Sequence, residues 1–185
     1  MSRLLAFSGS LRRDSFNSRL LAAAVAGAAD VELIRLDAFA LPLYDEDSER
    51  AGGLPEGARR LQALVREHSG LLLACPEYNS SFTPLLKNAI DWISRPQPGQ
   101  PPAFKGKVVG LLSASAGKLG GLRGLRHVRE SLTGLSALVL PEQFALSGAD
   151  QAFDEQGGLR EPRDLKAAQA VVQRVREVAA LWSRP

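Results

Sequence analysis

Hydrophobic and polar residues follow one another in blocks that predict five strands, each followed by a helix. Segments of strand length, either continuously apolar or alternating, lie at residues 4–7, 31–36, 71–75, 107–112 and 137–140, the last stopped by Pro141. After each of them, apolar residues recur every three or four positions, as is typical of amphipathic helices. These helical segments lie at about residues 18–28, 57–68, 84–95, 122–134 and 162–182. The alternation predicts an α/β protein with a parallel sheet.

The character of individual strands predicts their order in that sheet. Residues 71–75 are continuously apolar, as expected of a central strand that is buried on both faces. Residues 31–36 alternate and carry Glu32 and Arg35, which suits an edge. Five such strands favour the order 2-1-3-4-5 with helices on both faces, and a ligand site at the switch point between strands 1 and 3. No repeat or second unit is evident, so we expect one domain over residues 1–185.

The loop after the first strand has the composition of an anion site. Ser8-Gly9-Ser10 ends the strand, and Arg12, Ser15 and Asn17 precede the helix. Unpaired N–H groups at a helix start attract anions, and hydroxyl and guanidinium groups add donors, so a phosphate monoester would fit. Ordinary helix capping and chain turning explain the same residues. The single glycine matches neither the dinucleotide fingerprint nor the P-loop.

Two further loops follow the third and fourth strands and should meet the first. The segment Pro76–Pro84 contains a tyrosine and several polar residues, and residues 113–121 are small and include glycines that allow close backbone approach. Carboxyl ends of parallel strands share one edge of the sheet, so the three loops should converge. A planar ring with a phosphate tail fits all three, and flavin mononucleotide (FMN) matches best in shape.

Three motifs carry a resemblance to a known family. They are Gly9-Ser10-Leu11-Arg12-x-x-Ser15-x-Asn17, Pro76-Glu77-Tyr78-Asn79 and Leu86-Lys87-Asn88-Ala89-Ile90-Asp91-Trp92. In order and spacing the chain resembles the NADPH-dependent FMN reductase family, which includes bacterial quinone and chromate reductases. The resemblance implies a flavodoxin-like three-layer sandwich with bound FMN. It assigns the phosphate to Ser10, Arg12, Ser15, Phe16 and Asn17, the ring and ribityl chain to Pro76, Glu77, Tyr78 and Asn79, and a third approach to Ser115 and Gly117.

The resemblance also implies a reaction. NAD(P)H would pass hydride to bound FMN, and a quinone-like acceptor, a flavin, an azo compound or chromate would then take two electrons. No side chain is required as a general acid or base, so we predict no catalytic residue, and Tyr78 is the candidate that shapes the acceptor pocket. In this family the ring is commonly completed across a dimer, so we expect a homodimer or homotetramer, with the helix at 84–95 as a candidate interface. The alternative is a flavodoxin-type electron carrier, which would usually be acidic.

Composition narrows the setting. The 23 basic and 20 acidic residues give a net charge of +3, which does not call for nucleic acid and suits anionic small molecules. No apolar stretch has membrane-spanning length, and Cys75 is the only cysteine, so we expect a cytoplasmic protein with no disulfide. Cys75 has no arginine close behind it, which disfavours a low-molecular-weight phosphatase. The acidic run 45–47 is interpreted as a solvated loop rather than a metal site.

Overall fold

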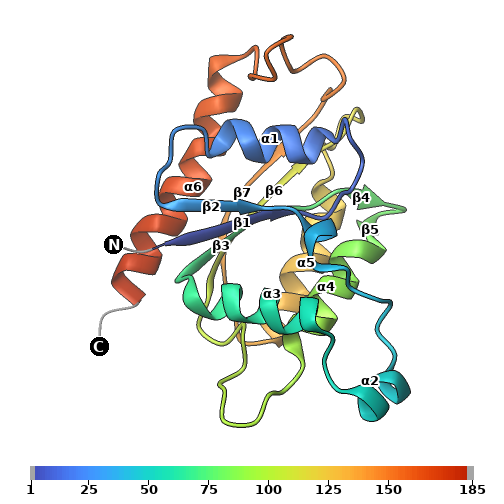
Figure 1. The fold of residues 1–185 in the computed structure, drawn as a ribbon. Helices are drawn as coiled ribbons and strands as arrows, with labels where there is room; N and C mark the ends of the chain where they lie inside the picture. Colours follow the sequence, from blue (N-terminus) through green and yellow to red (C-terminus); the bar gives the residue numbers. More distant parts are fainter. Residues whose placement is uncertain (1–2, 183–185) are drawn as a thin grey trace.

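The computed structural model describes residues 3–182 and contains a five-stranded parallel sheet in the order β2-β1-β3-β6-β7 (Figure 1). Its strands are β1 (Leu4–Ser8), β2 (Val31–Ile34), β3 (Gly70–Ala74), β6 (Val108–Ala114) and β7 (Leu138–Leu146). Counted along the chain without the short hairpin described below, this is the order 2-1-3-4-5. The predicted flavodoxin-like fold is therefore confirmed.

Helices cover both faces of the sheet, which gives three layers (Figure 1). Helices α1 and α6 pack on one face, whereas α3, α4 and α5 pack on the other. Their bounds are α1 (Phe16–Ala24), α3 (Glu56–Glu67), α4 (Pro84–Ser94), α5 (Leu122–Gly134) and α6 (Pro162–Trp182). Within the described residues, no helix is both long enough and apolar enough to cross a bilayer.

The continuous apolar runs form the middle of the sheet because side chains of a strand point alternately to its two faces. In β1, Leu4 and Ala6 join the core under α1 and α6, and Leu5 and Phe7 join the core under the other helices. All four are fully buried. The sheet therefore lies between two hydrophobic cores. Polar side chains that could bind a ligand lie in the loops and at the sheet edges.

The structure departs from the predicted elements in two places. Strand β7 does not stop at Pro141 but continues to Leu146, with a register shift opposite the segment between Val109 and Leu111. Proline is tolerated there because β7 is an edge strand and the irregularity removes the need for its missing N–H.

Short elements that were not predicted lie in two connections. The long connection after β2 contains the 3₁₀ turn η1 (Leu36–Phe39) and the helix α2 (Glu46–Gly52). Asp45 caps α2 by accepting a hydrogen bond from the Ser48 N–H at 2.7 Å, so part of the acidic run serves a helix start. After β3, a small antiparallel hairpin pairs β4 (Glu77–Tyr78) with β5 (Ser81–Phe82).

Candidate site at the carboxyl end of the sheet

The loops after β1 and β3 are fastened together where the sheet order reverses. The Gly9 N–H donates to the Ala74 carbonyl at 2.9 Å, and the Thr83 hydroxyl donates to the Gly9 carbonyl at 2.7 Å. A Cβ on residue 9 would lie 2.9 Å from Leu86 Cβ, so only glycine lets this loop approach α4 so closely. The first and second predicted loops therefore meet, as expected from the sequence.

The amino end of α1 offers unused hydrogen-bond donors beside a free cation. Ser15 caps the helix by accepting from the Ser18 N–H at 3.3 Å. Within residues 3–182, the N–H groups of Ser15, Phe16 and Asn17 have no hydrogen-bond partner. Arg12 is exposed, and none of the ion pairs among the described residues includes it. Donors and charge of this kind at a helix start are features that attract anions, so this is a candidate anion site.

Asn17 links the first loop to the third. Its side-chain amide donates to the Ala114 carbonyl at 2.8 Å and accepts from the Ala114 N–H at 3.0 Å. This side chain is buried and bonded to the Ala114 backbone as both donor and acceptor, so it joins the two loops, and the backbone N–H of Asn17 is the donor at the helix start. Its neighbour Phe16 stacks on Phe153 with ring centroids 6.3 Å apart, so the loop before α6 closes over the start of α1.

The hairpin after β3 presents Tyr78 to solvent. Tyr78 is 51% exposed, whereas Pro76 at the strand end is buried. The turn that follows places Asn79 and Ser80 in the left-handed region, with φ of 49° and 66°. Non-glycine residues adopt that conformation at a cost, and such residues often lie at functional sites. The hairpin thus lies beside the switch point of the sheet, where the sequence predicts the ring site.

The Glu77 carboxylate points away from solvent and toward α5. It accepts hydrogen bonds from the Gly124 N–H at 3.0 Å and from Arg123, with the closest approach 2.7 Å. Burial alone would raise the pKa of Glu77, but the Gly124 N–H and the Arg123 guanidinium outweigh it and hold that pKa below its ordinary value. Neither Arg123 nor Gly124 was predicted to act at the site, because a partner 47 residues distant leaves no local signal.

The third loop forms a compact turn above the end of β6. The Ser115 N–H donates to the Leu146 carbonyl at 3.0 Å, and the Ser115 hydroxyl accepts from the Gly117 N–H at 3.2 Å. Ser113 fastens the far side of the turn by donating to the Gly120 carbonyl. Ser115 is half-buried and Gly117 is exposed, so both predicted residues lie at the surface of this turn.

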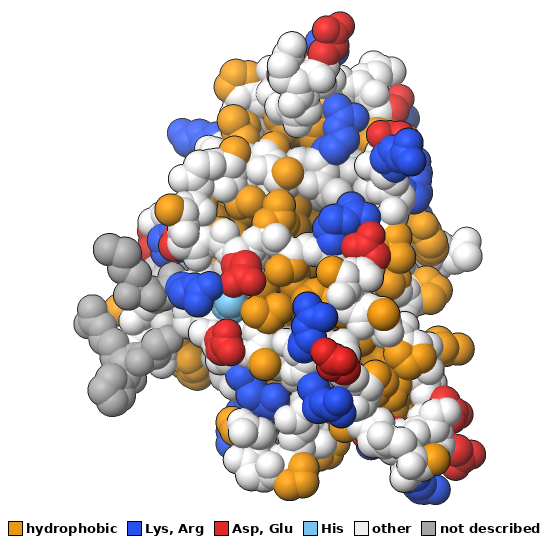
Figure 2. Space-filling model, viewed as in Figure 1, with side chains coloured by type: hydrophobic (Ala, Val, Ile, Leu, Met, Phe, Trp, Pro, Cys, Tyr) orange, Lys and Arg blue, Asp and Glu red, His pale blue; other side chains and the backbone are white. Residues whose placement is uncertain are grey.

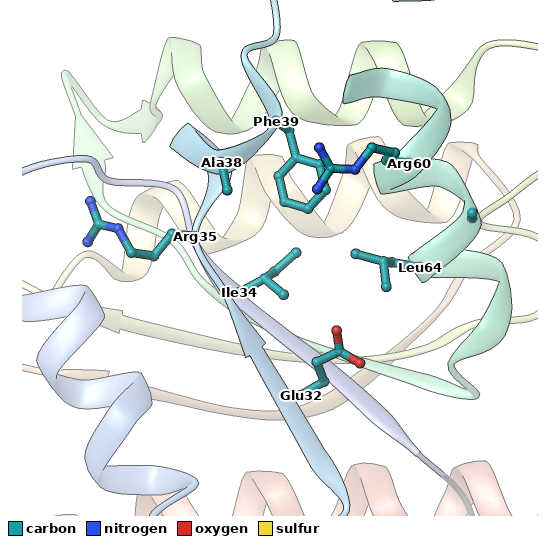
Figure 3. Close-up of a pocket in the computed structure, with 8 residues that line it drawn as sticks. Glu32, Ile34, Arg35, Ala38, Phe39, Arg60 and Leu64 are labelled. Atoms are coloured by element: carbon teal, nitrogen blue, oxygen red, sulfur yellow. The ribbon is translucent and has the colours of Figure 1, made fainter. Parts of the chain in front are cut away.

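A separate groove lies between α3 and the segment formed by β2 and η1. Hydrophobic side chains gather in the middle of the face shown in Figure 2, between α1 and α3. The groove there has a volume of about 500 Å³ and runs from Glu32, past Ile34 and Leu64, to Phe39 and Arg60 (Figure 3). None of the residues predicted to bind FMN lines it. The predicted site is thus assembled from loops and not from this groove.

Cys75 is buried at the end of β3, and burial raises the pKa of its thiol. A thiol that stays protonated and covered is a poor nucleophile. This agrees with the interpretation of Cys75 as a small hydrophobic core residue.

Comparisons with known proteins agree with this geometry. The model of the NADPH-dependent FMN reductase family matches residues 2–151. The chain is 40% identical to an NAD(P)H-dependent FMN reductase of Pseudomonas aeruginosa over 98% of this chain and 95% of the relative. It is 39% identical to a quinone reductase of Escherichia coli over 77% of this chain and 76% of the relative.

Solved structures give the same result. The flavoenzyme NAD(P)H:(acceptor) oxidoreductase of Paracoccus denitrificans superposes with a TM-score of 0.84 and 26% identity, covering 98% of both chains. The resemblance predicted from the motifs is confirmed, and so are the oxidoreductase class, FMN and NAD(P)H that it implies. This chain belongs to the NADPH-dependent FMN reductase family.

Proposed function

We propose that this protein transfers two electrons from NAD(P)H to a quinone-like acceptor, with FMN held at the carboxyl end of the sheet. The quinone reductase of Escherichia coli, at 39% identity, supports the acceptor class. The overall change is quinone plus NAD(P)H plus one proton to hydroquinone plus NAD(P)⁺. FMN, when bound, supplies the hydride-accepting ring.

The amino end of α1 carries the proposal. The segment of residues 10–17, which follows β1 at the switch point of the sheet, holds three N–H groups with no partner within the described residues. It also holds the hydroxyls of Ser10 and Ser15, and an arginine outside every ion pair of the described residues. A phosphate monoester is the dianion that such a set of donors fits. Arg12 would neutralise one charge, and the N–H groups of Ser15, Phe16 and Asn17 would bond the oxygens.

The segment Pro76–Asn79 would line the ring. Glu77 contributes through its backbone, because its carboxylate is already bonded to α5. Tyr78 is half-exposed and forms the side of the site that an acceptor would meet. Ser115 and Gly117 would approach from the third loop. These residues bind, orient and exclude water, and none is required to transfer a proton.

Absorbance spectroscopy and rapid mixing test this function. Purified protein should show a flavin spectrum, or acquire one with added FMN. Under anaerobic conditions NAD(P)H should bleach it, and one equivalent of a benzoquinone should restore it. Protein that binds no FMN would refute the proposal. Protein that binds FMN but is not rapidly reduced by NAD(P)H would instead be an electron carrier.

The proposal includes a homodimer or homotetramer that acts as a single-domain enzyme in the cytoplasm. Leu43 is 82% exposed but rigidly held, because Pro42 and Tyr44 on either side of it are bonded to α4. An exposed, fixed apolar side chain beside α4 favours a second copy as its cover. The buried, lone cysteine suits a reducing compartment. Sedimentation velocity measures the assembly state.

A further inference from the structure

The Glu77 carboxylate makes contacts that its predicted role as a ring-lining residue does not explain. Its side chain is only 9% exposed, and both carboxylate oxygens are engaged by α5. A carboxylate placed to contact a ligand would keep an oxygen free. The geometry therefore assigns the side chain to a contact inside the protein.

That contact completes the start of α5. The N-cap residue of α5 is Gly121, which has no side chain to accept a hydrogen bond from the first turn. Glu77 accepts from Gly124 in its place, and carries a negative charge at the positive end of the helix. A Cβ on residue 124 would lie 3.2 Å from the Ser81 carbonyl oxygen, so the hairpin and the helix touch through their backbones.

The hairpin needs such a support. Its turn contains two non-glycine residues in the left-handed region, Asn79 and Ser80, and it has only two paired residues on each strand. Isolated hairpins of this size are not stable in water. A second contact to α5, between Ser81 Oγ and His127 Nδ1 at 2.9 Å, fixes the other strand. Glu77 and Ser81 thus fasten the hairpin on both sides of Tyr78.

We propose that Glu77 is a positioning residue that holds the Tyr78 hairpin against α5 and thereby sets the shape of the acceptor side of the site. This inference rests on the proposed function only for the acceptor. The positioning itself is a property of the protein without FMN and is tested separately.

The two bonds of Glu77 differ in burial, so the bond to Gly124 should contribute more to stability than the ion pair with Arg123. The bond to the Gly124 N–H is sheltered, whereas the Arg123 side chain is 56% exposed and its charge is screened by water. Glu77→Gln keeps an oxygen that accepts from Gly124 and should behave nearly as wild type. Glu77→Ala leaves that N–H without its partner and should be the damaging change. Arg123→Met should have a small effect. A purely ionic role would make Glu77→Gln as harmful as Glu77→Ala.

Hydrogen exchange on FMN-free protein gives the first readout. Glu77→Ala should speed exchange at the Gly124 amide and across residues 77–83, and leave the strand amides of β1 and β3 unchanged. Glu77→Gln should restore protection. Asp30→Ala is the matched control, since it removes another paired carboxylate at the opposite end of the sheet. That control should lower stability without loosening the hairpin.

Steady-state kinetics of the FMN-loaded enzyme gives the second readout. Glu77→Ala should raise the KM for a benzoquinone about tenfold, as expected for one sheltered hydrogen bond lost. Asp30→Ala should leave that KM unchanged. Unchanged exchange in Glu77→Ala would overturn the inference, and so would a looser hairpin with an unchanged quinone KM. A wild type that reduces no quinone would refute the proposed function instead, while the exchange result would still decide the positioning.

Discussion

Among the described residues, polar groups are paired with one another at the amino end of the parallel sheet, whereas several remain unpaired at the carboxyl end. At the amino end, Lys107 donates to the carbonyls of Arg66 and His68 at 2.7 and 2.6 Å, and Arg176 grips Asp30 with bonds of 2.6 and 2.8 Å. These groups satisfy one another and leave little to offer a ligand. They close the carboxyl end of α3 and tie α6 to the start of β2.

At the carboxyl end, donors remain unused and the backbone is strained. The N–H groups of Ser15, Phe16 and Asn17 have no partner within the described residues, and the Asn79–Ser80 turn is left-handed. The two ends are built on the same strands, so composition of the sheet does not explain the difference. The comparison teaches that binding capacity lies where polar groups are held in place by the fold yet left without partners.

The largest effect should come from the double variant Arg12→Ala with Ser15→Ala at the carboxyl end. It removes a charge and a hydroxyl from the anion site, and charge-assisted hydrogen bonds contribute about 1.5–3 kcal/mol each. The Kd for FMN should rise by a hundredfold or more, on the order of 3 kcal/mol, measured by fluorescence quenching of added FMN. Unchanged FMN affinity would mean that the phosphate lies elsewhere.

Loss of the Ser15 cap also weakens α1, so that experiment needs a control. Asp45→Ala removes the side-chain cap of α2, away from the three loops, and leaves the anion site intact. It should cost a similar ~1 kcal/mol of stability with no change in FMN affinity. A parallel fall in FMN affinity would show that general destabilisation explains the double variant.

A middle-sized effect, confined to stability, is expected from Lys107→Met at the amino end. The change keeps most of the apolar stem but leaves two carbonyl oxygens at the end of α3 without their donor. The free energy of unfolding should fall by about 2 kcal/mol in chemical denaturation. FMN affinity of the folded variant should match wild type. If that affinity fell as well, the two ends would not be independent.

The sequence predicted the sheet, its order and the convergence of three loops, because continuous apolar runs and strand–helix alternation specify these locally. It also predicted an anion site around Ser10, Arg12 and Ser15, and this assignment stays a prediction. It did not foresee that the Asn17 side chain would bond Ala114, because that partner lies 97 residues away.

The remaining differences between prediction and structure arise from contacts between distant residues or from elements too short to predict. The Glu77 contact with α5 joins two segments that no periodicity connects. The hairpin 77–82 and the helix α2 are too short to produce a pattern of their own. Pro141 predicts the end of a strand, but β7 is an edge strand and continues past this proline with a register shift. Tertiary context therefore decides the details that local signals leave open.

The smallest effect should come from Asp30→Asn, and its pH dependence should tell the two ends apart. The hydrogen bond from Arg176 lowers the pKa of Asp30 below its ordinary value, although burial opposes the shift. A carboxyl with a lowered pKa in the folded state stabilises the protein above the unfolded pKa of about 3.9 and loses that contribution as the pH falls through its folded value. Because the pair is partly exposed, wild type should exceed the variant by only about 1 kcal/mol at neutral pH, and the gap should shrink in acid. Urea denaturation at about pH 7 and about pH 4 measures the gap. A gap that widened in acid would contradict the ion pair, and a change in FMN affinity would contradict the separation of the two ends.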